Sequence, residues 1–332
     1  MILTLVGLSE GVLADMAGRS RGTGADVIVR APDSSVLSFG LNMPEKVVDV
    51  VRKVEHVTEA TGALVHPIGG TDSITGIDID EFNKLSGGLE YLAGGPFHND
   101  NDLVVSRIFA QQRKLKPGSK YDFGHLWNIT GVVEEGKLSR TFADKRAMQS
   151  IFAEEGKISV IYLKVDDPAN IPVVLEELKK LLEGYKIYSM EEFVSLFTVD
   201  SVQFLRGFTN VVIIVASMVG FLAVFQSMYT AVLERTREIG ILKAMGASPG
   251  YILKILLWET VMLALAGTLV GIALTYGTRA LMAHFEPSMP QQIVPGWYLP
   301  AAGIALVGSL IGATYPGLKA ARQDAIEALA YD

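Results

Sequence analysis

Residues 234–248 read Glu234-Arg-Thr-Arg-Glu-Ile-Gly-Ile-Leu-Lys-Ala-Met-Gly-Ala-Ser248, and this charged stretch lies between two long apolar runs. Short basic segments between membrane-length apolar segments are typical of cytoplasmic loops. In a helix, the apolar residues of the stretch are interpreted as giving it an apolar side: Ile239, Ile241, Leu242 and Met245. Gly246 and Pro249 then break the pattern. We therefore predict a short helix along the membrane surface, which is either a simple interfacial connector or a docking element that fits a cleft in a cytoplasmic protein; we favour the docking element.

The flanking runs are long enough to cross a membrane. A bilayer core of about 30 Å needs about 20 helical residues, and no charged residue stands between Gly207 and Leu233. Two further apolar runs follow, so we predict spans at about 207–233, 252–283 and 297–315. A soluble core helix of such length and uniform apolarity would be unusual.

The placement of lysine and arginine predicts the orientation of these spans. Basic residues gather in the loop 234–251 and after the last span: Arg235, Arg237, Lys243, Lys319 and Arg322. The loop 284–298 has neither lysine nor arginine. We expect the loop 234–251 and the C-terminus to be cytoplasmic, and residues of about 19–204 to be extracytoplasmic.

The N-terminal residues fit the end of another span. Met1–Leu8 is apolar, but eight helical residues cover only about 12 Å of the core. No basic segment precedes them, as a signal peptide would require. We expect residues 1–18 to be a truncated first span and its exit, with the natural start upstream of Met1.

The region between the first and second spans reads as mixed α and β. Strands are expected at 25–30, 127–133 and 158–165, where β-branched residues cluster, and helices at 45–57 and 171–182. The predicted fold class is an α-helical integral membrane protein, with three full spans and a truncated first span, that carries an extracytoplasmic α+β domain. The expected domains are 1–18, 19–204 and 205–332.

Composition and motifs exclude several kinds of function. A net charge of −7 argues against nucleic acid as a partner, and the absence of cysteine removes disulfides and thiolate chemistry. The five histidines show no metal-ligand spacing, so no metal site is predicted. The acidic cluster lacks a calcium-loop pattern and is interpreted as a solvated turn: Asp72, Asp78, Asp80 and Glu81. No catalytic constellation or Walker motif stands out, so we expect neither an enzyme nor ATP hydrolysis by this chain alone.

The predicted spans contain features that favour helix packing. Four glycines form two small-xxx-small motifs, which let helices approach closely in lipid: Gly267, Gly271, Gly308 and Gly312. Their partner helix could belong to this chain or to another. Glu259 lies near the cytoplasmic end of its span, where a charge must be paired or wet, and it could pair with Arg235 or Arg237.

Thr236-Arg-Glu-Ile-Gly-Ile-Leu-Lys-Ala-Met-Gly-Ala247 resembles the signature of the MacB/FtsX-type ABC transporter permeases, which include LolC and LolE. The ending Pro316-Gly-Leu-Lys-Ala-Ala-Arg-Gln-Asp-Ala-Ile-Glu-Ala-Leu329 also resembles that family, although Ala325 stands where members usually have proline. Weaker matches to the MacB-like periplasmic core domain lie at 24–29, 76–82 and 129–133. The resemblance thus extends over nearly the whole chain, and the loop is its specific part.

The resemblance implies four spans, with a large extracytoplasmic domain between the first and the second. It also implies two permease chains, as a homo- or heterodimer, working with a separate ABC ATPase on the cytoplasmic side, which would bind the ATP and magnesium. The coupling role of the family's loop falls here on Glu234, Arg235, Thr236, Arg237, Glu238, Ile239, Gly240, Lys243, Ala244, Met245 and Gly246.

Two functions follow from the resemblance. One is ATP-driven export or extraction of lipoprotein, peptide or amphiphile, with a possible periplasmic adaptor. The other is an FtsX-like regulatory permease that switches an extracytoplasmic partner, such as a cell-wall hydrolase, without transport. This chain itself would bind no cofactor, and its non-protein partner would be membrane lipid.

Overall fold

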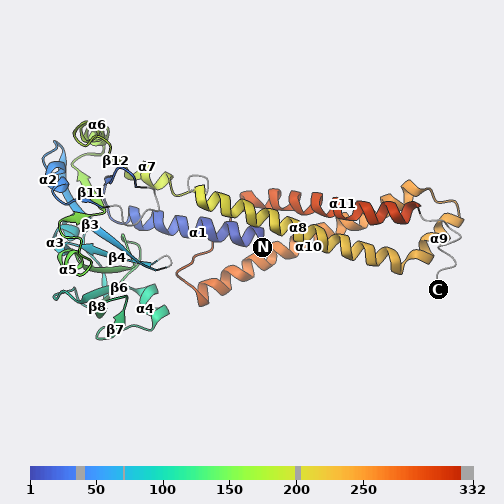
Figure 1. Cartoon of the computed structure of the whole chain (residues 1–332), viewed down its shortest axis with the longest axis horizontal. Helices are drawn as coiled ribbons and strands as arrows, with labels where there is room; N and C mark the ends of the chain where they lie inside the picture. Colours follow the sequence, from blue (N-terminus) through green and yellow to red (C-terminus); the bar gives the residue numbers. More distant parts are fainter. Residues whose placement is uncertain (35–41, 70–71, 199–202, 323–332) are drawn as a thin grey trace. The chain divides into compact units, whose positions relative to one another are not determined.

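The computed structural model describes residues 1–34, 42–69, 72–198 and 203–322, and the chain divides into two compact units. One unit contains Met1–Gly11, Gln203–Phe285 and the chain from Pro290 onward. The other contains Val12–Val202 together with Glu286–Met289. Figure 1 follows the chain from the blue N-terminus to the red C-terminal helix.

The first unit is helical. Its elements are α8 (Gln203–Glu234), α9 (Thr236–Ala244), α10 (Pro249–Phe285), the 3₁₀ turn η2 (Pro295–Trp297) and α11 (Tyr298–Arg322). Among the described residues, three helical segments are long and apolar enough to cross a membrane: Leu205–Glu234, Pro249–Phe285 and Pro295–Arg322. The three predicted spans are therefore confirmed. Helix α10 starts before the predicted span because Ser248 caps it and Pro249 occupies its first position: the Ser248 hydroxyl accepts a hydrogen bond from the Tyr251 amide at 3.3 Å.

Helix α1 (Ile2–Arg21) begins the chain and belongs partly to each unit. Its helical structure runs well beyond the apolar residues 1–8 and ends at two basic residues, Arg19 and Arg21. Positive side chains at a helix C-terminus are favourable because the last carbonyl groups carry partial negative charge. Within the described residues, α1 is not one of the helices that meet the length and hydropathy requirements for a span.

Small residues let α11 pack closely within the helical unit. Its buried residues are Gly312, Ala313, Pro316, Gly317, Ala320 and Ala321. A Cβ built on Gly312 would lie 3.0 Å from the carbonyl oxygen of Phe221 on α8. A Cβ on Gly317 would lie 2.9 Å from a methyl carbon of Leu253 on α10. Helix α11 therefore contacts both other long helices through residues without bulky side chains.

The described strands of the second unit form a ten-stranded sheet and a two-stranded sheet, and helices complete the unit. The strand order of the large sheet is β12-β1-β11-β3-β4-β9-β6-β8-β5, with β7 paired to β8. The strands are β1 (Val27–Arg30), β2 (Met43–Pro44), β3 (Val57–Gly69), β4 (Asp72–Ile77), β5 (Tyr91–Gly94), β6 (Asp102–Ser106), β7 (Lys120–Asp122), β8 (Leu126–Val133), β9 (Thr141–Asp144), β10 (Lys157–Ile158), β11 (Val160–Val165) and β12 (Lys186–Ser189). The helices are α2 (Val47–Val51), α3 (Ile79–Ser86), α4 (Arg107–Arg113), α5 (Lys145–Ile151), the 3₁₀ turn η1 (Pro168–Asn170), α6 (Ile171–Leu181) and α7 (Met190–Ser195).

Two hydrophobic cores lie against this sheet. The first joins β1, β11 and the start of β3 to α2 and α6, through residues such as Val29, Ile161 and Leu178. The second joins β6, β8 and β9 to α4 and α5, around Phe109 and Trp127. Strand β3 links the cores because its 13 residues pair with β11 in the first half and with β4 in the second. The mixed α and β composition is thus confirmed, including the strands at 25–30, 127–133 and 158–165 and the helix at 171–182.

Two predictions for this unit are wrong. The helix expected over 45–57 is only α2 (Val47–Val51), because His56 adopts a positive φ of 70° and β3 begins at Val57. The acidic cluster is not a solvated turn: the Asp78 side chain accepts hydrogen bonds from the first-turn amides of α3, which contains Asp80 and Glu81. The Asp-x-x-Glu spacing of residues 78–81 is a helix-start signal that the sequence already held. Asp72 begins β4.

Candidate functional site

The loop predicted to bind a partner forms a short helix, α9, joined to α8 by a single residue. Arg235 leaves helical geometry with φ −100° and ψ 16°, which turns the chain between the two helices. The Thr236 hydroxyl donates to the carbonyl oxygen of Val232 at 3.0 Å, back into the last turn of α8. This bond and the break at Arg235 fix the start of α9 relative to α8.

One face of α9 is buried. Thr236, Ile239 and Gly240 point inward, and Ile239 is part of a core cluster with residues of the three long helices. The other members are Met228, Val232, Ile252, Leu256, Ala313, Ala320 and Ala321. Ile239 therefore belongs to the same packed cluster as residues of α8, α10 and α11, which places the inner face of α9 in the core of the helical unit.

The end of α9 is a Schellman motif. The Gly246 amide donates to the Lys243 carbonyl at 2.9 Å, and the Ala247 amide donates to the Leu242 carbonyl at 3.0 Å. Gly246 has a φ of 95°, a conformation that glycine adopts without the steric cost of a side chain. The predicted break at Gly246 is therefore confirmed, and its cause is the left-handed backbone at this position.

Glu259 forms an ion pair across the helix ends. Its two carboxylate oxygens lie 3.1 and 3.2 Å from one guanidinium nitrogen of Arg235. Of the two partners that the sequence allowed, the structure selects Arg235. The pair joins the turn before α9 to the third turn of α10, and both side chains stay partly exposed.

The outward face of α9 differs from the sequence prediction. Ile239 and Ile241 were expected on one apolar side, but Ile239 is 6% exposed whereas Ile241 is 45% exposed and Met245 is 72% exposed. Arg237, Ile241 and Met245 are spaced four residues apart and all are exposed. We call these three residues the outer stripe; Glu238 is exposed beside it. Ile241 was missing from the predicted site, although its spacing from Arg237 and Met245 would have identified it.

The remaining predicted loop residues are mostly accessible. Glu234, Ala244 and Gly246 are exposed, and Lys243 is partly exposed. In the described part of the chain, no cluster of three or more His, Cys, Asp or Glu residues could hold a metal ion.

Of the four glycines in the two small-xxx-small motifs, one packs against another described helix of this chain. Gly312 lies against α8, as described above. A Cβ at Gly267, Gly271 or Gly308 would meet no atom within 4 Å in the described residues. Their expected role in packing therefore stays a prediction.

Comparison with known proteins places these features in a family. Residues 210–325 match the family described as FtsX-like permease C-terminal. The sheet unit is similar to the crystal structure of the extracellular domain of the ABC-type transporter YknZ, with a TM-score of 0.39, 16% identity and coverage of 49% of this chain and 98% of that one. It is also similar to the periplasmic region of MacB from Actinobacillus actinomycetemcomitans, with a TM-score of 0.39, 15% identity and coverage of 52% and 92%.

Among curated proteins, an uncharacterized ABC transporter permease, YknZ of Bacillus subtilis, is 32% identical over 84% of this chain and 73% of its own length. The macrolide export ATP-binding/permease protein MacB of Agrobacterium fabrum is 32% identical over 50% of this chain, but the match spans only 26% of that protein. The long match to the first of these relatives shows that the chain belongs to the ABC transporter permeases of the FtsX/MacB type.

Proposed function

We propose that this chain is the permease subunit that couples ATP hydrolysis in a separate ATPase to motion of its extracytoplasmic domain. The observation that carries the proposal is the two-sided character of α9. On its inner face Ile239 is buried in a cluster with residues of α8, α10 and α11, whereas its outer stripe remains exposed. Exposed apolar side chains next to charges are typical of a protein interface.

The outer stripe offers a partner both apolar area and charge. Ile241 and Met245 would supply the buried contact, and Arg237 and Glu238 would orient it. The proposed orientation, with the loop 234–251 and the C-terminus cytoplasmic and residues 19–204 outside, gives this surface to an ATPase in the cytoplasm. ATP and magnesium would be bound by that ATPase.

The contacts that hold α9 suggest how a force from the ATPase would be transmitted to the spans. The Thr236 hydroxyl bond connects α9 to α8, and the Arg235–Glu259 pair connects the same turn to α10. A force on α9 would therefore shift the ends of these helices instead of deforming a loose loop. Coupling of this kind needs contiguous packed elements.

The sheet unit in turn holds the segment that follows α10. The Arg140 guanidinium donates to the carbonyl oxygen of Ser288 at 2.7 Å and to the carboxylate of Asp15 at 2.9 Å. The Gln112 side-chain amide donates to the Ser288 hydroxyl at 2.7 Å. Because Ser288 lies between α10 and α11 in sequence, these bonds give motion of the spans a route into the extracytoplasmic domain.

The proposed assembly contains a second permease chain. The open surfaces at Gly267, Gly271 and Gly308 would receive its helices, which small residues allow to approach closely. For the substrate, we propose export or extraction of an amphiphile, peptide or lipoprotein, with a possible periplasmic adaptor. The names of the MacB relatives, which describe macrolide export, favour transport over the regulatory alternative.

Co-purification with the ATPase encoded beside this chain tests the coupling role. The variant Arg237→Glu, Glu238→Arg reverses the charge of the outer stripe and that of Glu238 beside it, and Ile241→Asp removes the apolar centre of the stripe. We expect each to reduce recovery of the ATPase about tenfold or more, since central apolar anchors dominate interfaces. ATPase activity in lipid should lose its dependence on the permease in parallel.

A matched control reverses two exposed charges of the same kind on α6, Glu176→Arg with Lys180→Glu. It should leave co-purification unchanged. Full recovery of the ATPase with the α9 variants would contradict the coupling role, and loss of it with the α6 variant would indicate a general folding defect.

A further inference from the structure

A short segment of the connection between α10 and α11 lies along the first half of α1. Pro290, Gln291 and Gln292 belong to the same unit as Met1–Gly11, and we call these three residues the strap. The backbone amide of Gln292 donates a hydrogen bond to the carbonyl oxygen of Gly7 at 2.8 Å. A helix carbonyl can accept this bond besides its helical one, because its oxygen has two lone pairs. The strap is thus bonded to the backbone of α1.

Two glycines of α1 make room for the strap. Gly7 and Gly11 are four residues apart, so they lie on one face of the helix, and both are buried. A Cβ on Gly11 would lie 1.7 Å from the carbonyl oxygen of Pro290. A Cβ on Gly7 would lie 2.3 Å from the carbonyl oxygen of Gln292. Non-bonded atoms do not approach so closely, so a side chain at either position would displace the strap.

The repeat distances of the two segments account for this fit. Four helical residues rise about 6 Å, and two residues of extended chain cover about 6.6 Å. Groups two residues apart in an extended chain also point to the same side. The carbonyl groups of Pro290 and Gln292 can therefore face two successive turns of α1. Because Pro290 meets Gly11 and Gln292 meets Gly7, the strap runs antiparallel to α1.

The middle residue of the strap opposes this close packing. Gln291 is 5% exposed, and within the described residues neither its side-chain amide nitrogen nor its amide oxygen makes a hydrogen bond. Its Cγ lies 3.3 Å from the place that a Cβ on Gly7 would take, so the side chain lies against α1. A buried amide without partners is unfavourable compared with the same amide in water. The strap is therefore held by its backbone and destabilised by one side chain.

We propose that the strap can open and release α1. In the closed state, which the structure describes, the Gln292 amide is bonded to Gly7 and the side-chain amide of Gln291 is buried. In the open state the bond to Gly7 is broken and the Gln291 amide is hydrated. The unfavourable burial of Gln291 brings the two states closer in free energy, so that a modest force at the ends of α10 and α11 opens the strap.

Opening of the strap would let α1 move separately from the connection between α10 and α11. In the proposed function, this happens when the ATPase drives the spans, and this part of the inference rests on that function. The two states of the strap themselves do not depend on an ATPase, because every contact that defines them lies within this chain.

Hydrogen exchange in the full chain, in lipid nanodiscs and without the ATPase, tests the two states. Opening exposes the backbone amide of Gln292, so the protection of this amide, relative to its intrinsic exchange rate, measures the closed population. Gln291→Met keeps the length of the side chain and removes the unpaired polar atoms. We expect it to raise the protection of the Gln292 amide about tenfold. Gln292→Met makes the same change on the exposed neighbour and should leave the protection nearly unchanged.

A glycine variant tests the closed contact from the side of α1. Gly11→Ala places a Cβ against the carbonyl oxygen of Pro290, and should lower the protection of the Gln292 amide about tenfold or more. Gly18→Ala is the matched control on the same helix, because a Cβ there meets no atom within 4 Å in the described residues. It should leave the protection of the Gln292 amide unchanged.

The proposal is overturned if Gln291→Met does not raise the protection of the Gln292 amide, since the buried amide would then carry no penalty. If this variant fails to fold by circular dichroism, Gln291→Leu replaces it. An unchanged protection in Gly11→Ala would equally overturn the closed contact.

ATP turnover of the complex with the ATPase tests the part that rests on the proposed function. Gln291→Met should lower turnover several-fold at unchanged co-purification, because the strap opens less often. Unchanged turnover would overturn the role of the strap in the cycle. If the unchanged chain binds no ATPase, the proposed coupling fails instead, and the exchange results still decide whether the strap opens.

Discussion

The two units of this protein place their apolar residues in opposite ways. In the sheet unit the largest side chains are enclosed, and Trp127, Phe82, Phe109 and Phe142 are each less than 2% exposed. In the helical unit the most apolar windows of the three spans are only 6%, 11% and 28% buried within the chain. The sheet unit therefore supplies its own interior, whereas α8 and α10 present apolar surface that lipid or another chain must cover.

Within the helical unit the same contrast appears on a smaller scale. Around α9, residues from all the long helices enclose Ile239 and form a packed core. Farther along the spans, Gly267, Gly271 and Gly308 have open space at their Cβ positions. The end of the unit that would receive force is thus packed within this chain, and the middle leaves room for other helices.

Truncation of equal side chains in the two units should give the largest difference. Phe142→Ala removes a ring that is 1% exposed in the sheet core, and should destabilise that unit by about 3–5 kcal/mol through the cavity that it leaves. Phe208→Ala removes a ring that is 49% exposed on α8, and should cost less than about 1 kcal/mol. Pulse proteolysis in urea measures both in the full chain. Similar losses of stability in the two variants would contradict the contrast between the sheet unit and the helical unit.

Crowding a glycine should separate packed from open parts of α11. Gly312→Val places methyl groups against the backbone of α8, where a Cβ alone would lie 3.0 Å from the Phe221 carbonyl oxygen. We expect a loss of about 1–3 kcal/mol, seen as a lower melting temperature in detergent. Gly303→Val on the same helix meets no atom within 4 Å in the described residues and should melt almost unchanged. An equal shift in both variants would contradict the assigned packing of α11 on α8.

The sequence predicts features that depend on neighbours along the chain. The spans follow from runs without charge such as 207–233, and the end of α9 follows from Gly246. Which face of α9 is buried does not follow, because the core cluster that contains Ile239 includes Ala320 and Ala321, about 80 residues later in the chain. Residues two apart point to opposite sides of a helix, so the grouping of Ile239 with Ile241 on one apolar side is wrong, and the structure shows Ile239 buried and Ile241 exposed.

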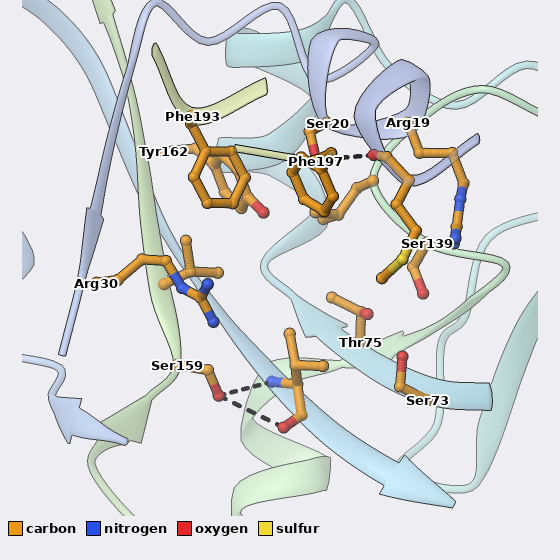
Figure 2. Close-up of a pocket in the computed structure, with 14 residues that line it drawn as sticks. Arg19, Ser20, Arg30, Ser73, Thr75, Ser139, Ser159, Tyr162, Phe193 and Phe197 are labelled. Atoms are coloured by element: carbon orange, nitrogen blue, oxygen red, sulfur yellow. Dashed lines mark hydrogen bonds between the residues drawn. The ribbon is translucent and has the colours of Figure 1, made fainter. Parts of the chain in front are cut away.

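A small cavity in the sheet unit, shown in Figure 2, illustrates a stronger limit on what the sequence can predict. Its walls combine Arg19, Arg30, Thr75, Tyr162 and Phe193 from five separate elements, and no local motif joins them. Arg30 stands in a strand whose other residues are apolar, and that is the single local sign of an unusual position. Its meaning depends on the pairing of β1 with β11 and on the placing of α7, which require the complete sheet.

A smaller effect is expected where the end of α9 depends on backbone conformation. Gly246→Ala puts a side chain on a residue with φ 95°, and should cost about 1–2 kcal/mol although the surrounding space is open. Amide exchange in α9 should become faster, since the Schellman bonds would weaken. Gly250→Ala, in the first turn of α10, has no positive φ and equally open space, so it should be neutral or slightly stabilising. If exchange in α9 is the same in both variants, the left-handed cap does not hold the helix end.

The smallest effect lies on the exposed surface of the sheet unit, where solvent screens charge. His56 Nδ1 lies 2.9 Å from the Asp166 carboxylate; this hydrogen bond raises the pKa of His56, while hydrogen bonds from Asn170 and then His56 lower that of Asp166 to about 2. A raised histidine pKa stabilises the fold fully below the unfolded value of about 6.5, and this is lost as pH rises through the folded pKa. A lowered aspartate pKa stabilises above about 4, and this is lost as pH falls toward 2.

The ion pair should therefore contribute most between about pH 4 and 6.5, and its contribution to global stability should be slight because both groups are exposed. Asp166→Asn should lower the pKa of His56 toward its ordinary value in an NMR titration of ¹³C-labelled histidine. The matched variant Asp167→Asn keeps the Asp166 partner and should leave that titration nearly unchanged. If the pKa of His56 is the same in Asp166→Asn as in the unchanged chain, the ion pair does not persist in solution. The stability of the sheet unit would then depend on its two apolar cores and not on this surface contact.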